Sequence, residues 1–110
     1  IIVNAIKIFF QKGSKYNNIK VYLGPSIKSC CYEVKSDVAN FFNKDYKKCR
    51  QEKIYLNLTK KVKDDLLSLG INNNNISISK VCTFGNKEYC SYRREKENAD
   101  RMYSLFGAIN

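Results

Sequence analysis

GPSIKSCCYEV, residues 24–34, is the most informative stretch of the chain. It directly follows a predicted strand, because residues 19–23 alternate apolar and polar side chains. Gly24 permits a close backbone approach or a positive φ, and Pro25 fixes the direction in which the chain leaves the strand. Such a turn either lines a pocket at the end of the strand or makes a tight connection from strand to helix.

Two longer helices are predicted on either side of this stretch. Apolar residues recur at helical spacing over residues 1–11, which predicts an amphipathic helix. The same spacing predicts a second helix that is capped by Asn57 or Thr59 and runs to Leu69. Gly70 follows it and suits the left-handed conformation that often ends a helix.

Shorter elements alternate with these helices. Residues 54–56 and 76–80 predict strands, and residues 43–53 are so charged that they predict a surface loop. Ser36 is expected to N-cap a short helix. The apolar residues that this helix would bury are Val38, Phe41 and Phe42. Alternating helices and strands predict an α/β fold, or a mixed α+β fold, with the elements packed in layers.

The composition allows one domain or part of one. Apolar residues make up 44% of the 110 residues, which is enough for a core. The most apolar run, residues 1–10, is interrupted by Asn4 and Lys7, so it predicts neither a membrane span nor a secretion signal. Because the chain opens on Ile1 inside a predicted helix, without an initiator methionine, we expect a fragment or a processed product.

The net charge of +10 raises the question of nucleic-acid binding. Most of the 20 basic residues are lysines scattered along the chain. Asparagine and isoleucine are also abundant, a combination that indicates an AT-rich coding sequence rather than a selected binding surface. We therefore expect a solvated lysine surface, with neither a nucleic acid nor a membrane as partner.

The five cysteines are Cys30, Cys31, Cys49, Cys82 and Cys90. An odd count without a signal peptide argues against a disulfide framework and predicts a cytoplasmic protein. Adjacent cysteines in an extended segment point to opposite faces, so we expect buried small side chains and no metal site. The alternative is a zinc site assembled from Cys30, Cys31, Cys82 and Cys90, although their spacing is not that of a zinc ribbon.

A second stretch, SYRR at residues 91–94, carries the strongest candidate binding group. Gly85-Asn86 is a turn signal between residues 82–84 and 89–92, which predicts a hairpin or an irregular loop. Arg93 and Arg94 follow this aromatic segment, and alternation along a strand would turn one guanidinium inward to bind phosphate or carboxylate. The alternative is an arginine that orders its own loop by pairing with a local carboxylate. The carboxylates available for this are Glu33, Glu88 and Glu95.

Taken in order, GPSIKSCCYEV, VCTF at residues 81–84, SYRR and Arg101–Met102 closely resemble the C-terminal half of the bacterial laccase-domain family, also called polyphenol oxidases. The resemblance covers the chain from about Ile2 to Ile109. It implies a layered α-β-β-α sandwich of which only the C-terminal half is present, as one partial domain over residues 1–110. It also favours a final strand over the helix that Met102, Leu105, Phe106 and Ile109 would form.

This chain departs from the family pattern in two places. Lys28 stands where the family often has glycine. The sequence Ala99-Asp100 stands before Arg101–Met102 where the family usually has a shorter turn ending in glycine. The second departure puts the conformation of that turn in doubt.

Members of this family are regarded as zinc-dependent purine nucleoside phosphorylases with adenosine deaminase activity, and were described earlier as copper-dependent laccases. Their metal ligands are two histidines and a cysteine, all N-terminal to the part seen here. This chain has no histidine. The resemblance therefore implies a fragment that contributes a pocket wall and a phosphate-binding arginine, without catalytic residues, and that binds neither zinc nor copper by itself. Its partners would be a purine nucleoside, phosphate and the missing N-terminal half.

The substrate-binding residues implied by the resemblance are Tyr32, Glu33, Arg93 and Arg94. Glu33 would act as an acid–base group or accept a hydrogen bond from a ribose hydroxyl, unless its role is structural. A non-enzymatic basic binding module derived from the same family is the alternative function. A third reading is a half-domain that is stable only when paired with its N-terminal half or with itself.

Overall fold

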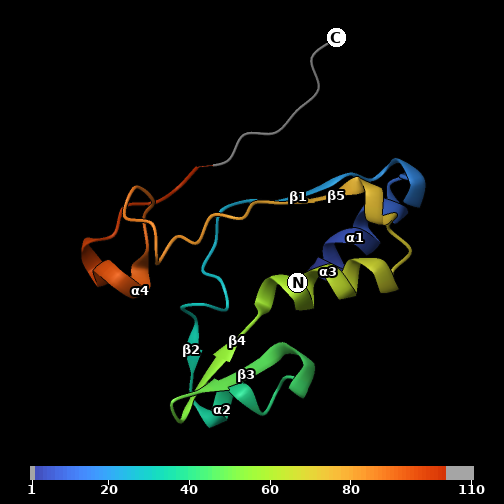
Figure 1. Ribbon diagram of the computed structural model, residues 1–110. Helices are drawn as coiled ribbons and strands as arrows, with labels where there is room; N and C mark the ends of the chain where they lie inside the picture. Colours follow the sequence, from blue (N-terminus) through green and yellow to red (C-terminus); the bar gives the residue numbers. More distant parts are fainter. Residues whose placement is uncertain (1, 104–110) are drawn as a thin grey trace.

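The computed structural model describes residues 2–103, in which two units contain the sheets and α4 belongs to neither (Figure 1). The helices are α1 (Ile2–Gln11), α2 (Ser36–Ala39), α3 (Leu58–Ser68) and α4 (Tyr92–Glu95). The strands are β1 (Val21–Leu23), β2 (Glu33–Val34), β3 (Lys47–Arg50), β4 (Lys53–Leu56) and β5 (Ile76–Ile78). Single 3-10 turns occupy Tyr16–Asn18, Lys44–Tyr46, Asn73–Asn75 and Lys96–Asn98. No helix of residues 2–103 is long and apolar enough to cross a membrane.

The first unit, which we call the parallel unit, contains α1, β1, α3 and β5. Strands β1 and β5 pair in parallel, with Val21 opposite Ile76. Figure 1 shows α1 and α3 lying together beside this two-stranded sheet. Its buried core consists of Ile6, Ile19, Leu66 and Ile71. The core therefore lies between the two helices and the segments that lead into β1 and β5, which contribute Ile19 and Ile71.

Local sequence explains why α3 begins and ends where it does. The side chain of Asn57 accepts a hydrogen bond from the backbone N–H of Lys60, so Asn57 is the N-cap. Gly70 has φ +95°, a left-handed conformation that glycine adopts without strain. This turn places Ile71, which is 2% exposed, back in the core. The predicted cap, helix and stop are thus confirmed, as are the strands predicted around residues 21–23, 54–56 and 76–78.

The second unit, the antiparallel unit, contains β2, α2, β3 and β4. Its strands lie in the order β2-β4-β3, and both pairs of neighbouring strands are antiparallel. A two-residue turn joins β3 to β4, and both turn residues have positive φ, Gln51 at 50° and Glu52 at 66°. Paired positive φ values give the twist that a tight hairpin needs. The prediction of a surface loop over residues 43–53 is therefore wrong, because this charged segment forms an exposed edge strand.

Helix α2 differs from its prediction in what it buries. Lys35, not Ser36, occupies the N-cap position, and the helix ends at Ala39. Ala39 is 1% exposed and Phe42 packs against the same cluster, but Phe41 is 87% exposed. A helix of four residues presents too little surface to bury a full stripe, so Val38 and Phe41 face outward. The expected burial of Val38 and Phe41 is wrong, and that of Phe42 holds in part.

The segment after β5 is irregular. Ser26 and Cys82 form an isolated parallel bridge, which extends the pairing of β1 and β5 by one step. Residues 83–85 make turns, so of the hairpin and the irregular loop expected around Gly85, the structure shows the irregular loop. Residues 89–91 form no strand and Tyr92–Glu95 is one turn of helix, so the strand considered at residues 89–92 is not present. The strand predicted near the C-terminus falls largely on residues 104–110, outside the described residues.

Candidate functional site

Three cysteine thiols meet where the chain enters the antiparallel unit. Ser29–Cys31 forms a turn, and the N–H groups of Cys31 and Tyr32 both donate to the carbonyl of Lys28. The turn brings the sulfur atoms of Cys30 and Cys31 to 3.0 Å from each other. The sequence predicted an extended segment with these side chains on opposite faces, and that prediction is wrong because the backbone turns here.

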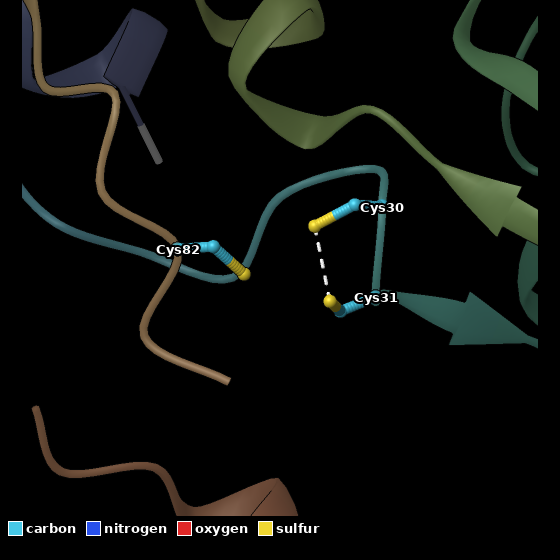
Figure 2. Close-up of side chains that lie close together, drawn as sticks. All are labelled: Cys30, Cys31 and Cys82. Carbon is cyan, nitrogen blue, oxygen red and sulfur yellow. Dashed lines mark hydrogen bonds between the residues drawn. The ribbon is translucent and has the colours of Figure 1, made fainter. Parts of the chain in front are cut away.

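Cys82 completes this group, which we call the thiol cluster. The Sγ atoms of Cys30, Cys31 and Cys82 all lie within 4.8 Å of one another. Figure 2 shows Cys82 on a separate segment, facing the pair that precedes β2. Its position follows from the bridge between Ser26 and Cys82, since that bridge holds the two segments side by side. All five cysteines of the chain are free thiols. Of the four cysteines in the alternative zinc site, the structure groups Cys30, Cys31 and Cys82, and Cys90 does not join them.

Backbone N–H groups and neighbouring thiols shift the pKa values of Cys82 and Cys31 in opposite directions. Burial opposes ionisation of Cys82, but N–H groups of Lys28 and Gly85 point at its sulfur and lower its pKa to about 7. A hydrogen bond with Cys30, together with burial, raises the pKa of Cys31 to about 12. Cys82 is therefore a thiolate in a large share of molecules at neutral pH, while Cys31 is a thiol. This combination of one thiolate and a protonated neighbour is that of a reactive or metal-binding cysteine.

Arg93 lies against the residues that follow the thiol cluster. Its guanidinium stands 4.8 Å from the centre of the Tyr32 ring. One of its N–H groups donates to the carbonyl of Glu33 at 2.9 Å. Among residues 2–103, that carbonyl is its one hydrogen-bond acceptor, and the side chain is exposed. The fold thus brings together Tyr32, Glu33 and Arg93, which we call the Arg93 site.

Arg94 points the other way, into its own loop. Its guanidinium donates to the carbonyls of Thr83 at 2.7 Å and Phe84 at 3.0 Å, and also bonds Tyr89 and Glu95. Four acceptors use most of the donors that a guanidinium has. Arg94 therefore orders residues 83–95, as the structural alternative for this pair of arginines predicted.

Sequence reasoning missed the groups that hold the thiol cluster in place. Arg50 of β3 donates to the carbonyl of Cys30 at 2.8 Å, and its guanidinium lies 4.0 Å from the Tyr55 ring centre. Lys28 reaches Thr59 at the start of α3 with its ammonium group, at 3.4 Å. A Cβ at Gly85 would lie 3.7 Å from the sulfur of Cys31. These contacts join segments that are distant in the sequence, so no local motif indicates them. The strand β3, which carries Arg50, was itself not predicted.

An open apolar groove runs along the parallel unit, away from the thiol cluster. It has a volume of about 710 Å³ and is lined by α1, by β1 and by Gly24. Ile8 and Phe9 of α1 are each 54% exposed nearby. Apolar surface gathered in this way usually marks a place that another polypeptide or a ligand covers.

Comparison with known proteins places these features in a family. Residues 1–108 match the family described as multi-copper polyphenol oxidoreductase laccase. A purine nucleoside phosphorylase of Borreliella burgdorferi is 36% identical over 117 residues, covering 99% of this chain and 49% of the relative. A purine nucleoside phosphorylase of Aquifex aeolicus is 31% identical, covering 96% of this chain and 48% of the relative. The chain thus spans about half the length of the curated relatives that it matches.

Solved structures show the same fold. The hypothetical protein YfiH of Bacillus licheniformis aligns with a TM-score of 0.75 at 25% identity, covering 86% of this chain and 39% of that protein. YlmD of Geobacillus stearothermophilus aligns with a TM-score of 0.74, covering 86% of this chain and 38% of that protein. The predicted mixed α/β class and the resemblance to laccase-domain proteins are confirmed.

Proposed function

The chain belongs to the laccase-domain family described above, and from that premise we propose that it is the C-terminal part of a purine nucleoside phosphorylase. Two relatives named for that activity match nearly all of this chain with about half of their own length. The proposed substrates are therefore a purine nucleoside and phosphate. The role of this part is to supply one wall of their pocket.

The observation that carries this proposal is the Arg93 site. Stacking on Tyr32 and one hydrogen bond to the carbonyl of Glu33 hold the exposed guanidinium in place, and its other N–H groups have no acceptor among residues 2–103. A guanidinium that is positioned but still has donors to spare binds a phosphate dianion well. Arg94 does not share this role, because its donors serve loop carbonyls and Glu95. We assign phosphate binding to Arg93 and support of the loop to Arg94.

The chemistry on the nucleoside belongs to another part of the protein. The family resemblance implies zinc held by two histidines and a cysteine, and the deaminase activity would use the same ion. This chain has no histidine, so its residues do not fit that ligand set. Its own contribution is limited to binding and orienting the substrates.

The parallel unit supports the proposal that a further half packs on this chain. Within residues 2–103, the two parallel strands of three residues each pair only with each other, so both outer edges of this sheet have no partner strand there. Parallel sheets are normally larger and covered on both faces. The apolar groove beside α1 and β1 gives the N-terminal half a surface on which to pack.

The experiment that tests this proposal starts with the coding DNA upstream of the Ile1 codon. We expect the frame to continue into a segment that supplies the two histidines and the cysteine. The protein from that frame is then assayed for phosphorolysis of inosine, as Arg93→Gln, Arg94→Gln and the control Arg101→Gln. Loss of charged hydrogen bonds to phosphate should lower kcat/KM for phosphate by about 10- to 100-fold in Arg93→Gln.

The other two variants separate binding from folding. Arg94→Gln should lower the melting temperature, because it removes a support of the 83–95 loop. Arg101→Gln should change neither quantity. A protein that phosphorolyses inosine equally well without Arg93 would disprove the assignment of phosphate binding, and a frame without histidines would disprove the proposed activity.

A further inference from the structure

The thiol cluster is not explained by packing. Neither buried core contains any of its three cysteines. Cys30 is exposed, and Cys31 and Cys82 are half-buried. A cysteine that serves as a small hydrophobic side chain is normally buried in apolar surroundings. Here the sulfur of Cys82 instead accepts the backbone N–H of Lys28 at 3.4 Å.

The spacing of the three sulfur atoms fits one bound ion. Metal–sulfur bonds of about 2.3 Å place the sulfur atoms around a trigonal or tetrahedral ion about 3.8 to 4.0 Å apart. The thiols lie 3.0 Å apart at the closest and within 4.8 Å throughout. The required spacing lies within the range that the three sulfur atoms already span, and Cys30 and Cys31 lie on a turn with Cys30 at the surface.

The ligand atoms select the class of ion. Thiolate sulfur is soft and favours Zn²⁺ or Cu⁺ over Mg²⁺ or Ca²⁺. Within residues 2–103, no histidine, aspartate, glutamate or further cysteine joins the three thiols as a fourth ligand. The site would therefore hold either a three-coordinate ion or an ion whose fourth ligand is water.

We propose that Cys30, Cys31 and Cys82 together bind one thiophilic closed-shell metal ion, Zn²⁺ or Cu⁺. The ion would join the segment that leaves β5 to the turn that enters β2, and so fasten the parallel unit to the antiparallel unit. This inference concerns an ion separate from the one that the family's histidines hold. It stands or falls independently of phosphorolysis.

The test measures metal binding by the reduced 110-residue chain under anaerobic conditions. One arm titrates Zn²⁺ against a chromophoric chelator, and a second titrates Cu⁺ against a cuprous chelator. Co²⁺ serves as a spectroscopic probe, since thiolate ligands give it an intense charge-transfer absorption. We expect one equivalent bound in at least one of the first two arms, with a Co²⁺ spectrum typical of thiolate ligation.

Matched serine variants identify the ligands. Loss of an outer hydrogen-bond partner of a metal ligand costs about 10- to 100-fold in affinity. Cys30→Ser and Cys82→Ser each remove a ligand itself and should weaken binding by more than that. Cys49→Ser and Cys90→Ser lie outside the cluster and should bind as the unchanged chain does. Cys30 is exposed, so its replacement tests the site even if Cys82→Ser disturbs the fold. Equal losses in all four variants, or none in Cys30→Ser, would overturn the proposal.

Discussion

The antiparallel unit pairs its strands within one short stretch of chain, whereas the parallel unit pairs strands from opposite halves of the chain. In the first, Arg50 lies across from Lys53 over a two-residue turn. In the second, Val21 of β1 meets Ile76 of β5 only after the whole antiparallel unit and α3 have intervened. Closing a hairpin loses little chain entropy. A long-range parallel pair closes a longer loop, loses more entropy and must offset that loss by burying apolar surface. The parallel unit accordingly depends more on its helices.

The largest expected effects distinguish the cores of the two units. Among the described residues, Leu66 and Leu56 are the largest fully buried side chains, one in each unit. Leu66→Ala and Leu56→Ala should each lower the free energy of unfolding by about 2–5 kcal/mol. Amide hydrogen exchange should show lost protection in α1, β1, α3 and β5 for Leu66→Ala, and in β2, β3 and β4 for Leu56→Ala. Leu67→Ala, at a 40% exposed position next to Leu66, is the control.

A result that contradicts this comparison is easy to recognise. If either substitution removes protection from all strands at once, the two units form a single cooperative structure. The contrast between local and long-range pairing would then have no bearing on stability.

Gly70→Ala sharpens the comparison by acting on the parallel unit alone. Gly70 has φ +95° and sets the turn that returns Ile71 to the core. A side chain in this conformation should cost about 1–2 kcal/mol of the free energy of unfolding, measured in urea. The matched control is Gly24→Ala, where φ is not positive and the added Cβ meets only the Tyr22 ring at 3.8 Å. Equal losses at both positions would show that φ is not the cause.

Asn57→Ala tests the joint between the units. Its side chain caps α3, and its own N–H donates to the carbonyl of Tyr46 at 2.8 Å. Loss of the cap should cost about 1 kcal/mol. Because β4 ends directly before Asn57, this loss should appear in the hydrogen exchange of α3 and leave the β3–β4 pair protected. Asn57→Ser, which keeps a capping side chain, should recover most of the stability.

The smallest effect concerns the hydrogen bond that crosses between the units. The Tyr46 hydroxyl donates to Asp64 of α3 at 2.8 Å, and this bond raises the pKa of Tyr46. A raised pKa means that the folded chain favours the protonated phenol. The resulting stability is present below the unfolded pKa of about 10 and is lost as pH rises through the higher folded pKa.

Urea midpoints at several pH values check this prediction. The midpoint of the unchanged chain should exceed that of Tyr46→Phe near neutral pH, and the difference should vanish in strong alkali. Tyr22→Phe, at an exposed position of β1, corrects for general effects of removing a hydroxyl. A difference that stays constant with pH would show that the bond to Asp64 is not its source.

The periodic spacing of apolar residues predicted the parallel unit better than the antiparallel unit. Apolar spacing and the residues Asn57 and Gly70 were enough for α3. Strand β3 was missed because Lys47, Lys48 and Arg50 carry no apolar alternation, and its turn uses Gln51 and Glu52 in place of glycine or asparagine. An edge strand is specified by its partner, here β4, and a single-sequence pattern does not contain that information.

The same reason limits what sequence predicts about the candidate site. The grouping of Tyr32, Glu33 and Arg93 was proposed from motifs, and the fold does bring them together. The thiol cluster was considered only as the alternative to buried cysteines, because it depends on a turn at Cys30–Cys31 and on the bridge from Ser26 to Cys82, and no spacing motif indicates either. For Arg94, most hydrogen-bond acceptors are backbone carbonyl groups, and a motif of side chains does not show which carbonyls will lie nearby.

The charged edge strand β3 has a consequence for aggregation. Its lysine and arginine side chains repel another strand that would add to that edge, which is a common protection against sheet growth. Strands β1 and β5, with sequences VYL and ISI, carry no charge. When the chain is concentrated alone, intermolecular sheet growth should therefore begin at the β1–β5 pair. Lysine substitutions there should raise its solubility more than further charge on β3.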